Sequence, residues 1–107
     1  MSDAFQEREN TFEKQFAHDE DLRFRALARR NKAMALWIAD MEGLKGGEAE
    51  KYATEFVLHN VGRGDGDVAA ALRAELRRTN LDVSDHRLTK KMEEEMAEAV
   101  ASVKAGR

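Results

Sequence analysis

The sequence predicts an all-α protein, a small four-helix bundle with a flexible or partly helical N-terminal arm. Among its 107 residues there is no proline, so nothing obliges a helix interior to break. Alanine, leucine, glutamate, arginine and lysine are abundant, and these are strong helix formers. Apolar residues recur at helical spacing in four stretches separated by glycines or capping residues. We expect an arm over residues 1–19 and a bundle over 20–107, with helices at about 20–42, 47–61, 66–79 and 84–104.

The first helix, 20–42, is predicted from an apolar stripe that spans about 100° of a helical wheel. Its members are Phe24, Leu27, Met34, Ile38 and Met41, with Asn31 inside the stripe. Gly43 followed by Leu44 is typical of a Schellman stop, which places the end of the helix near Glu42. We expect Leu36 and Trp37 to pack within the bundle, because later helices cover this helix from two sides.

The second helix, 47–61, carries the stripe Ala49, Tyr52, Ala53, Phe56 and Asn60. The glycines at 62, 64 and 66 favour a break after it, and the loop they form is interpreted as a linker rather than a phosphate site. Either Asp65 or Asp67 is expected to cap the third helix, 66–79, whose narrow stripe is Val68, Leu72 and Leu76.

The fourth helix, 84–104, begins with a capping signal. Ser84 is the expected N-cap, and Val83 before it and Leu88 after it form a hydrophobic staple. The buried face is predicted to hold Leu88, Met92, Met96, Ala99 and Val103. From Ala101 onward the chain is expected to fray.

The arm holds three phenylalanines, Phe5, Phe12 and Phe16, that fall within about 40° of one another on a helical wheel. One interpretation is that this ridge extends the first helix and packs on the bundle, although Glu20 and Arg23 interrupt the stripe. The other is a segment that becomes helical when a groove on a partner accepts its phenylalanines. Both remain open at this point.

Charge is polarised along the first forty residues. Residues 1–20 hold six acids against two bases, and residues 21–40 hold five bases against two acids. Such a dipole steers a protein partner, whereas nucleic acid requires an excess of positive charge over a whole face. Arg29, Arg30 and Lys32 form either a docking patch or pairs with acids such as Glu50 and Glu55, with Arg29 facing solvent.

Several classes of function are not supported. The chain has no cysteine, and it shows no catalytic triad, paired catalytic carboxylates or nucleotide fingerprint, so no enzyme activity and no cofactor are expected. Its three histidines, His18, His59 and His86, are too scattered to predict a metal site. No apolar run approaches about 18 residues, so we expect no membrane insertion and a cytoplasmic monomer.

The residues also resemble a known family, the zeta subunit that inhibits the F-type ATP synthase of alphaproteobacteria. The resemblance covers nearly the whole chain. It is carried by Phe5, Arg8, Glu9, Glu13, the run from Phe16 to Asp19, the run from Ala28 to Lys32, Leu36, Trp37, Gly43, Leu44, Tyr52, Ala53 and the turn from Asp82 to His86.

The resemblance implies that the N-terminal arm enters a catalytic alpha/beta interface of the F1 head as a helix and blocks rotation in the hydrolytic direction. The bundle would serve as the anchor. The partners implied are the alpha, beta and gamma subunits of F1, which places the chain on the cytoplasmic face of the inner membrane when bound. The inhibitory role falls on Phe5, Arg8, Glu9, Phe12, Glu13, Phe16 and Asp19.

Two alternatives come from other classes of protein. The basic cluster from Arg23 to Lys32 would suit a small helical nucleic-acid-binding regulator, against which stand the acidic net charge of -3 and the lack of an aromatic platform. The second alternative is a nucleotide-sensing helical bundle.

Overall fold

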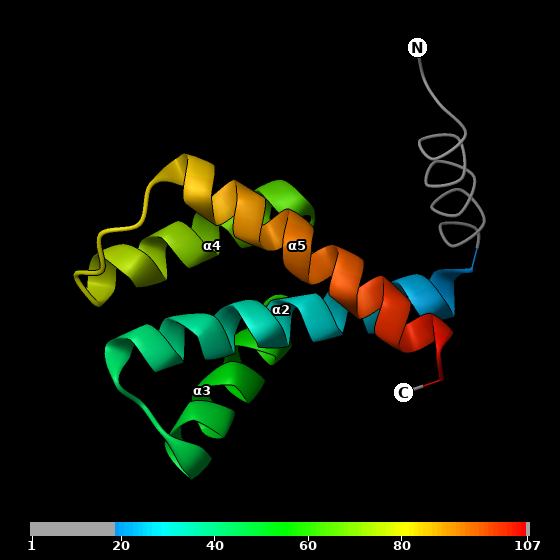
Figure 1. Cartoon of the computed structure of the whole chain (residues 1–107), viewed down its shortest axis with the longest axis horizontal. Helices are drawn as coiled ribbons and strands as arrows, with labels where there is room; N and C mark the ends of the chain where they lie inside the picture. Colours follow the sequence, from blue (N-terminus) through cyan, green and yellow to red (C-terminus); the bar gives the residue numbers. More distant parts are fainter. Residues whose placement is uncertain (1–18, 107) are drawn as a thin grey trace.

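The computed structural model describes residues 19–106, and this part of the chain is built from α-helices alone (Figure 1). The all-α, four-helix prediction is confirmed, and every helix boundary lies within two residues of the expected one. The helices are α2 (Glu20–Glu42), α3 (Gly46–His59), α4 (Asp65–Arg78) and α5 (Asp85–Lys104).

Helix α2 is closed at both ends by local hydrogen bonds. Asp19 is the N-cap, and its carboxylate accepts a hydrogen bond from the backbone N–H of Leu22 at 3.1 Å. At the other end Gly43 takes a left-handed conformation, φ 93°, and the Leu44 N–H donates to the Ala39 carbonyl at 2.9 Å. This is the Schellman stop expected from the sequence.

The connection between α3 and α4 differs from the prediction. Gly62 supplies a left-handed residue, φ 77°, but Gly66 lies inside the first turn of α4 rather than in the break. The N-cap of α4 is Gly64, and no side chain caps this helix. The expectation that Asp65 or Asp67 is the cap is therefore wrong, because both lie within the helix and leave the cap position to glycine.

Helix α5 begins as predicted, with the Ser84 hydroxyl accepting a hydrogen bond from the Arg87 N–H at 3.1 Å. It continues to Lys104, and Val103 is buried. The prediction of fraying from Ala101 is wrong, because the last turn packs against the start of α2.

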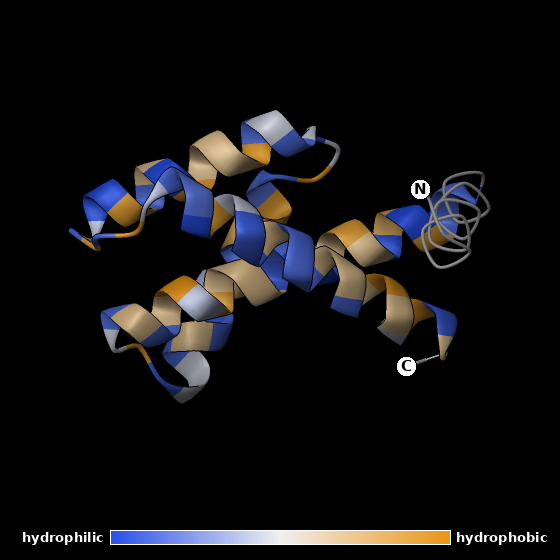
Figure 2. Cartoon of the chain, turned by 45° about the horizontal axis from the view of Figure 1, so that its top comes forward, coloured by the Kyte–Doolittle hydropathy of each residue, from blue (hydrophilic) through white to orange (hydrophobic). Residues whose placement is uncertain are grey.

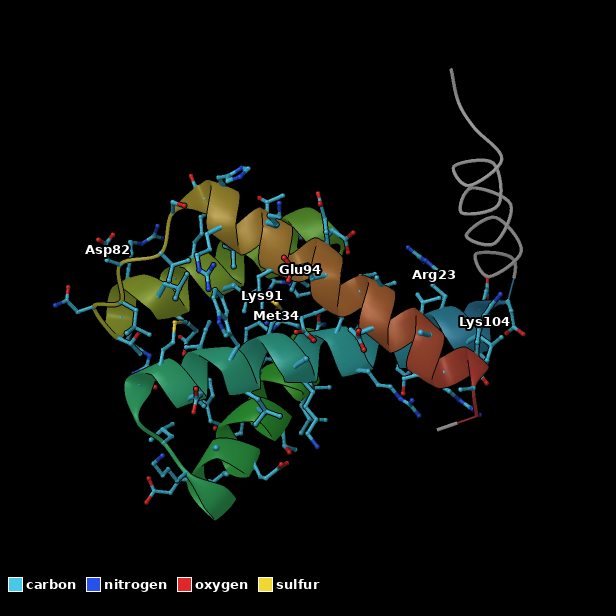
Figure 3. The ribbon with its side chains drawn as sticks, viewed as in Figure 1. Arg23, Met34, Asp82, Lys91, Glu94 and Lys104 are labelled. Carbon is cyan, nitrogen blue, oxygen red and sulfur yellow. The ribbon has the colours of Figure 1, made fainter. Side chains whose placement is uncertain are left out.

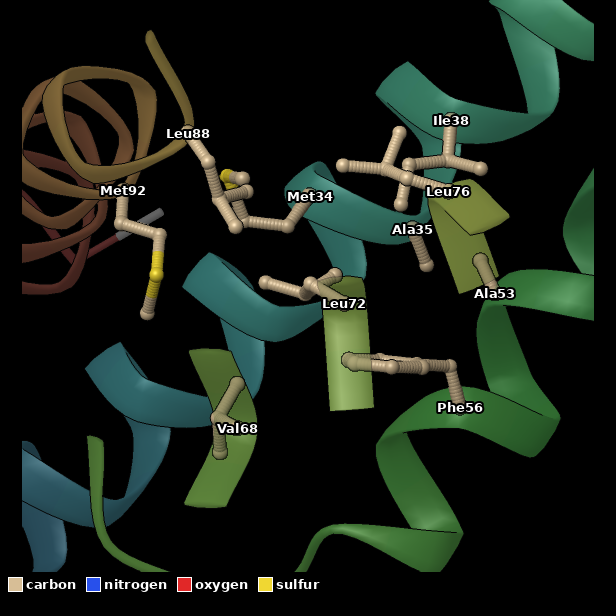
Figure 4. Close-up of a cluster of buried hydrophobic side chains, with 10 residues drawn as sticks. All are labelled: Met34, Ala35, Ile38, Ala53, Phe56, Val68, Leu72, Leu76, Leu88 and Met92. Carbon is tan, nitrogen blue, oxygen red and sulfur yellow. The ribbon is translucent and has the colours of Figure 1, made fainter. Parts of the chain in front are cut away.

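The main core lies where α2 meets the other three helices (Figure 4). Leu72 of α4 lies between Met34 of α2 and Phe56 of α3 in this view, and all three are buried. The cluster comprises Met34, Ala35, Ile38, Ala53, Phe56, Val68, Leu72, Leu76, Leu88 and Met92. All of them except Ala35 were predicted core positions, and Leu36 and Trp37 pack against the cluster as expected.

A second, smaller cluster joins the beginning of α2 to the end of α5. It consists of Ala26, Ala99 and Val103, with Leu22, Met96 and Val100 packed around them. Figure 1 shows the start of α2, in blue, and the end of α5, in red, running antiparallel beside each other. Figure 2 shows hydrophilic and hydrophobic residues mixed along each helix. This end of the molecule therefore depends on few and mostly small apolar side chains.

The buried face of α2 is rotated from the predicted stripe. Its buried residues are Ala26, Arg30, Asn31, Met34, Ala35, Ile38 and Ala39, a set dominated by i, i+4 rows. Phe24, a predicted stripe member, is 54% exposed. Because α5 packs on one side of α2 and α3 on another, the position of the buried face follows from both contacts rather than from hydrophobicity alone.

Candidate functional site

The seven residues predicted for the inhibitory arm meet the described structure only at Asp19. Phe5, Arg8, Glu9, Phe12, Glu13 and Phe16 lie outside the described residues. Asp19 has a structural role as N-cap, and its backbone is extended, with φ -101° and ψ 98°. An unbroken helix that runs through Asp19 into α2 is excluded by this geometry.

The predicted docking patch is divided among three separate contacts. The Arg29 guanidinium donates to the hydroxyl of Ser102 at 2.6 Å and is partly buried, so the expectation that Arg29 faces solvent is wrong. Lys32 pairs with Glu50 at 3.1 Å, one of the two acids suggested for it. Arg30 is buried, with 2% of its surface exposed. Arg29 and Lys32 are therefore the members of the patch that retain accessible surface.

Arg30 links α2 to the start of α4. Its Nη1 atom lies 2.7 Å from Oδ1 of Asp65, and its Nε and Nη2 atoms donate to Oδ1 of Asn31 at 3.1 and 3.0 Å. The Asp65 side chain is 73% exposed, so the buried cation is paired with a carboxylate that keeps its contact with water. Asn31 lies in the predicted stripe and contributes to the contact between α2 and α4 indirectly, because its amide oxygen holds Arg30.

We expect Arg30→Ala to lower the free energy of unfolding by about 2–4 kcal/mol. The buried Oδ1 of Asn31 loses both of its donors, and the packing of the arginine stem is lost. Urea unfolding followed by circular dichroism measures the change.

The matched control is Arg25→Ala, in the same helix. Arg25 is 59% exposed and pairs with Asp21 at 3.1 Å across one turn, an interaction that contributes about 0.5 kcal/mol. Arg30→Met, which keeps the apolar stem without the charge, should fall between the two. Equal losses for Arg30→Ala and Arg25→Ala would contradict the structural role.

A groove opens between the first half of α2 and the end of α3, with a volume of about 480 Å³. Its apolar walls are Phe24 and Leu27 on one side and Val57 and Val61 on the other. Phe24 and Val61 are 54% and 52% exposed, respectively. Leu58, at 68%, is the other large exposed hydrophobic residue of the described part, and it does not line the groove.

Two arginines lie at the rim of this groove. Arg23 projects from the first turns of α2 (Figure 3), and its guanidinium forms no hydrogen bond or ion pair with any residue between 19 and 106. Arg63, in the loop before α4, donates to the neutral amide oxygen of Asn60 at 3.1 Å. Two acids, Glu20 and Asp65, also line the groove, and Asp65 is paired with Arg30. The groove thus combines apolar walls with a rim of mixed charge on which neither arginine is paired with an acid of the described part.

A polar network ties the other side of α3 to α4. The Tyr52 hydroxyl donates to Oε1 of Glu75 at 2.7 Å, and Arg78 contacts the same carboxylate at 3.0 Å. Burial raises the pKa of Tyr52, and its bond to Glu75 raises it further. Burial opposes ionisation of Glu75, but the hydrogen bonds from Arg78 and Tyr52 outweigh it and lower the pKa of that carboxyl. The network is therefore a neutral tyrosine held by an ion pair, an arrangement that fixes helices rather than one that transfers protons.

Trp37 lies partly buried against the main core, and two cations cover its ring. The guanidinium carbon of Arg87 and the Nζ of Lys91 each lie 5.8 Å from the ring centroid. These are cation–π contacts between α2 and α5. Trp37 therefore packs within the bundle, as predicted.

Between residues 19 and 106 no group of three or more potential metal ligands converges. The ring of His59 contacts the Glu55 carbonyl at 2.8 Å on its own helix, and His86 is exposed at the start of α5. Within the same residues no helix is long and apolar enough to cross a membrane.

The groove is the feature that sequence reasoning missed. Val57 and Val61 were not singled out, Arg63 was considered only as part of a linker, and Phe24 was assigned to the core. One sequence signal exists: Val57 and Val61 lie four residues apart and so share a helical face, away from the predicted stripe.

Comparison with known proteins gives one result. A family model described as ATPase inhibitor subunit zeta matches residues 1–102. A search of curated proteins finds no match, and neither does a search of solved structures.

Proposed function

The chain belongs to the ATPase inhibitor subunit zeta family and is a regulatory protein rather than an enzyme, and from this premise we propose how it inhibits the ATP synthase. In the proposal, residues 1–18 fold as a helix into a catalytic alpha/beta interface of F1 and block rotation in the hydrolytic direction. Phe5, Phe12 and Phe16 anchor the segment, while Arg8, Glu9 and Glu13 set its orientation.

The observation that carries this proposal is the extent of the family match, which begins at residue 1 and so includes the whole aromatic segment. A second observation supports it. The cap at Asp19 starts α2 independently of what precedes it, so residues 1–18 are not needed to begin the helical body. Eighteen residues in a helix measure about 27 Å, enough to reach through a cleft between two subunits.

The helical body is proposed to anchor the segment at the alpha, beta and gamma subunits, on the cytoplasmic face of the inner membrane. Of the docking patch, Lys32 and the accessible part of Arg29 are offered to the partner, and Arg30 stays within the body. Rim charges of this kind mainly set orientation and association rate.

A cross-linking experiment tests where the segment goes. The chain contains no cysteine, so Gln6→Cys introduces a single thiol that carries a photoreactive group. With the F1 of the same organism and MgATP, we expect an adduct with the alpha or beta subunit. The matched control is Lys90→Cys, at an exposed position of α5. An adduct from position 90 with none from position 6 would contradict the proposal.

The nucleic-acid alternative loses support in the structure. Within its basic cluster Arg25 pairs with Asp21, Arg30 with Asp65 and Lys32 with Glu50. Nucleic-acid binding depends on phosphate neutralisation by unpaired cations on one face, and these three are each paired with an acid.

A further inference from the structure

The groove between α2 and α3 exposes apolar surface in the middle of an otherwise polar region. Phe24 and Val61, each more than half exposed, line it together with Leu27 and Val57. Neighbouring apolar side chains that water reaches in this way are typical of a binding surface. The described residues leave the groove open, so any group that covers it would come from outside residues 19–106.

Residues 1–18 enter the described structure at the end of this groove. Glu20, the first residue of α2, is one of its lining residues, and the extended backbone of Asp19 permits the chain to change direction there. Along α2 the groove runs from Glu20 to Asn31, about 17 Å at 1.5 Å per residue. Eighteen residues exceed that length even as a helix, so the segment is able to turn back and cover the groove.

The chemistry of the segment complements that of the groove. Residues 1–18 contain Phe5, Phe12 and Phe16 and carry four acids against two bases. The groove has apolar walls and a rim that carries two arginines and two acids, Glu20 and Asp65. Asp65 is paired with Arg30, whereas the Arg23 guanidinium has no partner between residues 19 and 106 and that of Arg63 is bound only to a neutral amide. Aromatic rings thus meet apolar walls, and acidic side chains meet arginines.

We propose that in the free protein residues 1–18 fold back into the α2/α3 groove, with the rings of Phe12 and Phe16 against Phe24, Leu27, Val57 and Val61. The regulatory meaning of this contact depends on the proposed function, whereas the contact itself does not. The rings that bind F1 are then occupied within the chain, and the segment must leave the groove before it inhibits. The chain with its segment in the groove is therefore a latent form of the inhibitor, one that does not bind F1.

Two other occupants fit less well. A second copy docked face to face would offer the arginines only Glu20 and Asp65, fewer acids than the four of residues 1–18, and would bring its own arginines with them. A patch on F1 would have to compete with a tethered segment, whose effective concentration reaches the millimolar range for a short connection. The tether therefore favours the segment of the same chain.

The direct test uses a nitroxide on Gln6→Cys in the full-length, ¹⁵N-labelled chain. We expect the label to broaden the backbone amide signals of Val57, Val61 and Arg63, and we expect Phe12→Ala with Phe16→Ala to abolish that broadening. No broadening at the groove would overturn the proposal. A second sample mixes ¹⁵N-labelled chains that lack the nitroxide with unlabelled chains that carry it. Broadening of the groove signals in this mixture would show contact between two chains, and would overturn the proposal in favour of a dimer.

Two further results are decisive in the same spectra. If ADP shifts the groove signals of the wild-type chain while the two alanine substitutions leave them unchanged, the groove is a nucleotide site and the proposal is wrong. If Val61→Ser releases the broadening while Leu58→Ser preserves it, the groove contact is supported. Leu58 is the matched control because it is an exposed residue near the same helix end that does not line the groove.

Inhibition of F1 hydrolysis supplies the functional readout. A latched state populated about tenfold over the open one weakens apparent binding by a similar factor, so Val61→Ser should strengthen inhibition about 3–10-fold. Leu58→Ser should leave it unchanged. Weaker inhibition by Val61→Ser would mean that the groove binds F1 instead, and would overturn the latent state. If the wild-type chain itself does not inhibit, the proposed function fails while the nitroxide result still decides the fold-back.

Discussion

Replacing Phe5, Phe12 and Phe16 together by alanine is expected to weaken inhibition of ATP hydrolysis by at least about 30-fold. One well-buried aromatic anchor contributes about 2 kcal/mol to a protein interface, and a tenfold change in affinity corresponds to about 1.4 kcal/mol. Three rings on one ridge are the largest apolar surface that residues 1–18 possess. Titration of purified F1 with the full-length variant, followed by steady-state ATP hydrolysis, measures the loss.

The control for this variant is Gln6→Ala with Gln15→Ala, which alters polar side chains of the same segment. We expect it to change inhibition by about twofold or less, because polar side chains away from the buried ridge contribute little. The residues that form the main core lie between 34 and 92, so both variants should remain folded. If the triple variant inhibits as strongly as the wild type, the aromatic anchors are not the source of inhibition.

Replacing Leu72 by alanine is expected to lower the free energy of unfolding by about 3–5 kcal/mol. Its side chain is completely buried in α4, within a cluster to which all four described helices contribute. The substitution removes three buried carbons and leaves a cavity that neighbouring side chains fill only in part. A small domain is stable by about 5–15 kcal/mol in total, so this variant should unfold at much lower urea concentration.

Leu58→Ala provides the matched comparison, since the same atoms are removed from a side chain that is 68% exposed. Alanine also has the higher helix propensity, and we expect a change within about 0.5 kcal/mol. Similar losses at positions 58 and 72 would show that the cluster around Leu72 is not the main source of stability.

Local signals in the sequence were sufficient to locate the helices. Gly43 and Leu44 mark the end of α2 because a left-handed glycine followed by an apolar residue closes a helix by itself. Ser84 marks the start of α5 for a similar reason. The narrow stripe of α4 also identified its buried side chains, because this helix packs through one face.

Features that depend on contacts distant in the sequence were not predictable in this way. An arginine carries no local sign of burial, and Arg30 is buried because Asp65, 35 residues later, reaches its guanidinium. Asp65 is the first residue of α4 rather than its N-cap. Phe24 was assigned to the core because a wheel places it beside Leu27, but its exposure is decided by where α3 ends.

The candidate site shows the same division. The aromatic spacing of Phe5, Phe12 and Phe16 is visible in the sequence, and it remains a prediction since these residues lie outside the described part. The α2/α3 groove could not be predicted, because it exists only where two helices approach and leave apolar walls uncovered.

The small cluster of Ala26, Ala99 and Val103 makes a weak contact between the start of α2 and the end of α5, close to where residues 1–18 join the helical body. Even with Leu22, Met96 and Val100 packed around it, this cluster buries fewer apolar side chains than the main core, so opening this end costs less free energy than opening the rest. If residues 1–18 act as proposed, a force applied through them would first open the contact between the start of α2 and the end of α5. The main core would stay folded while this contact opens.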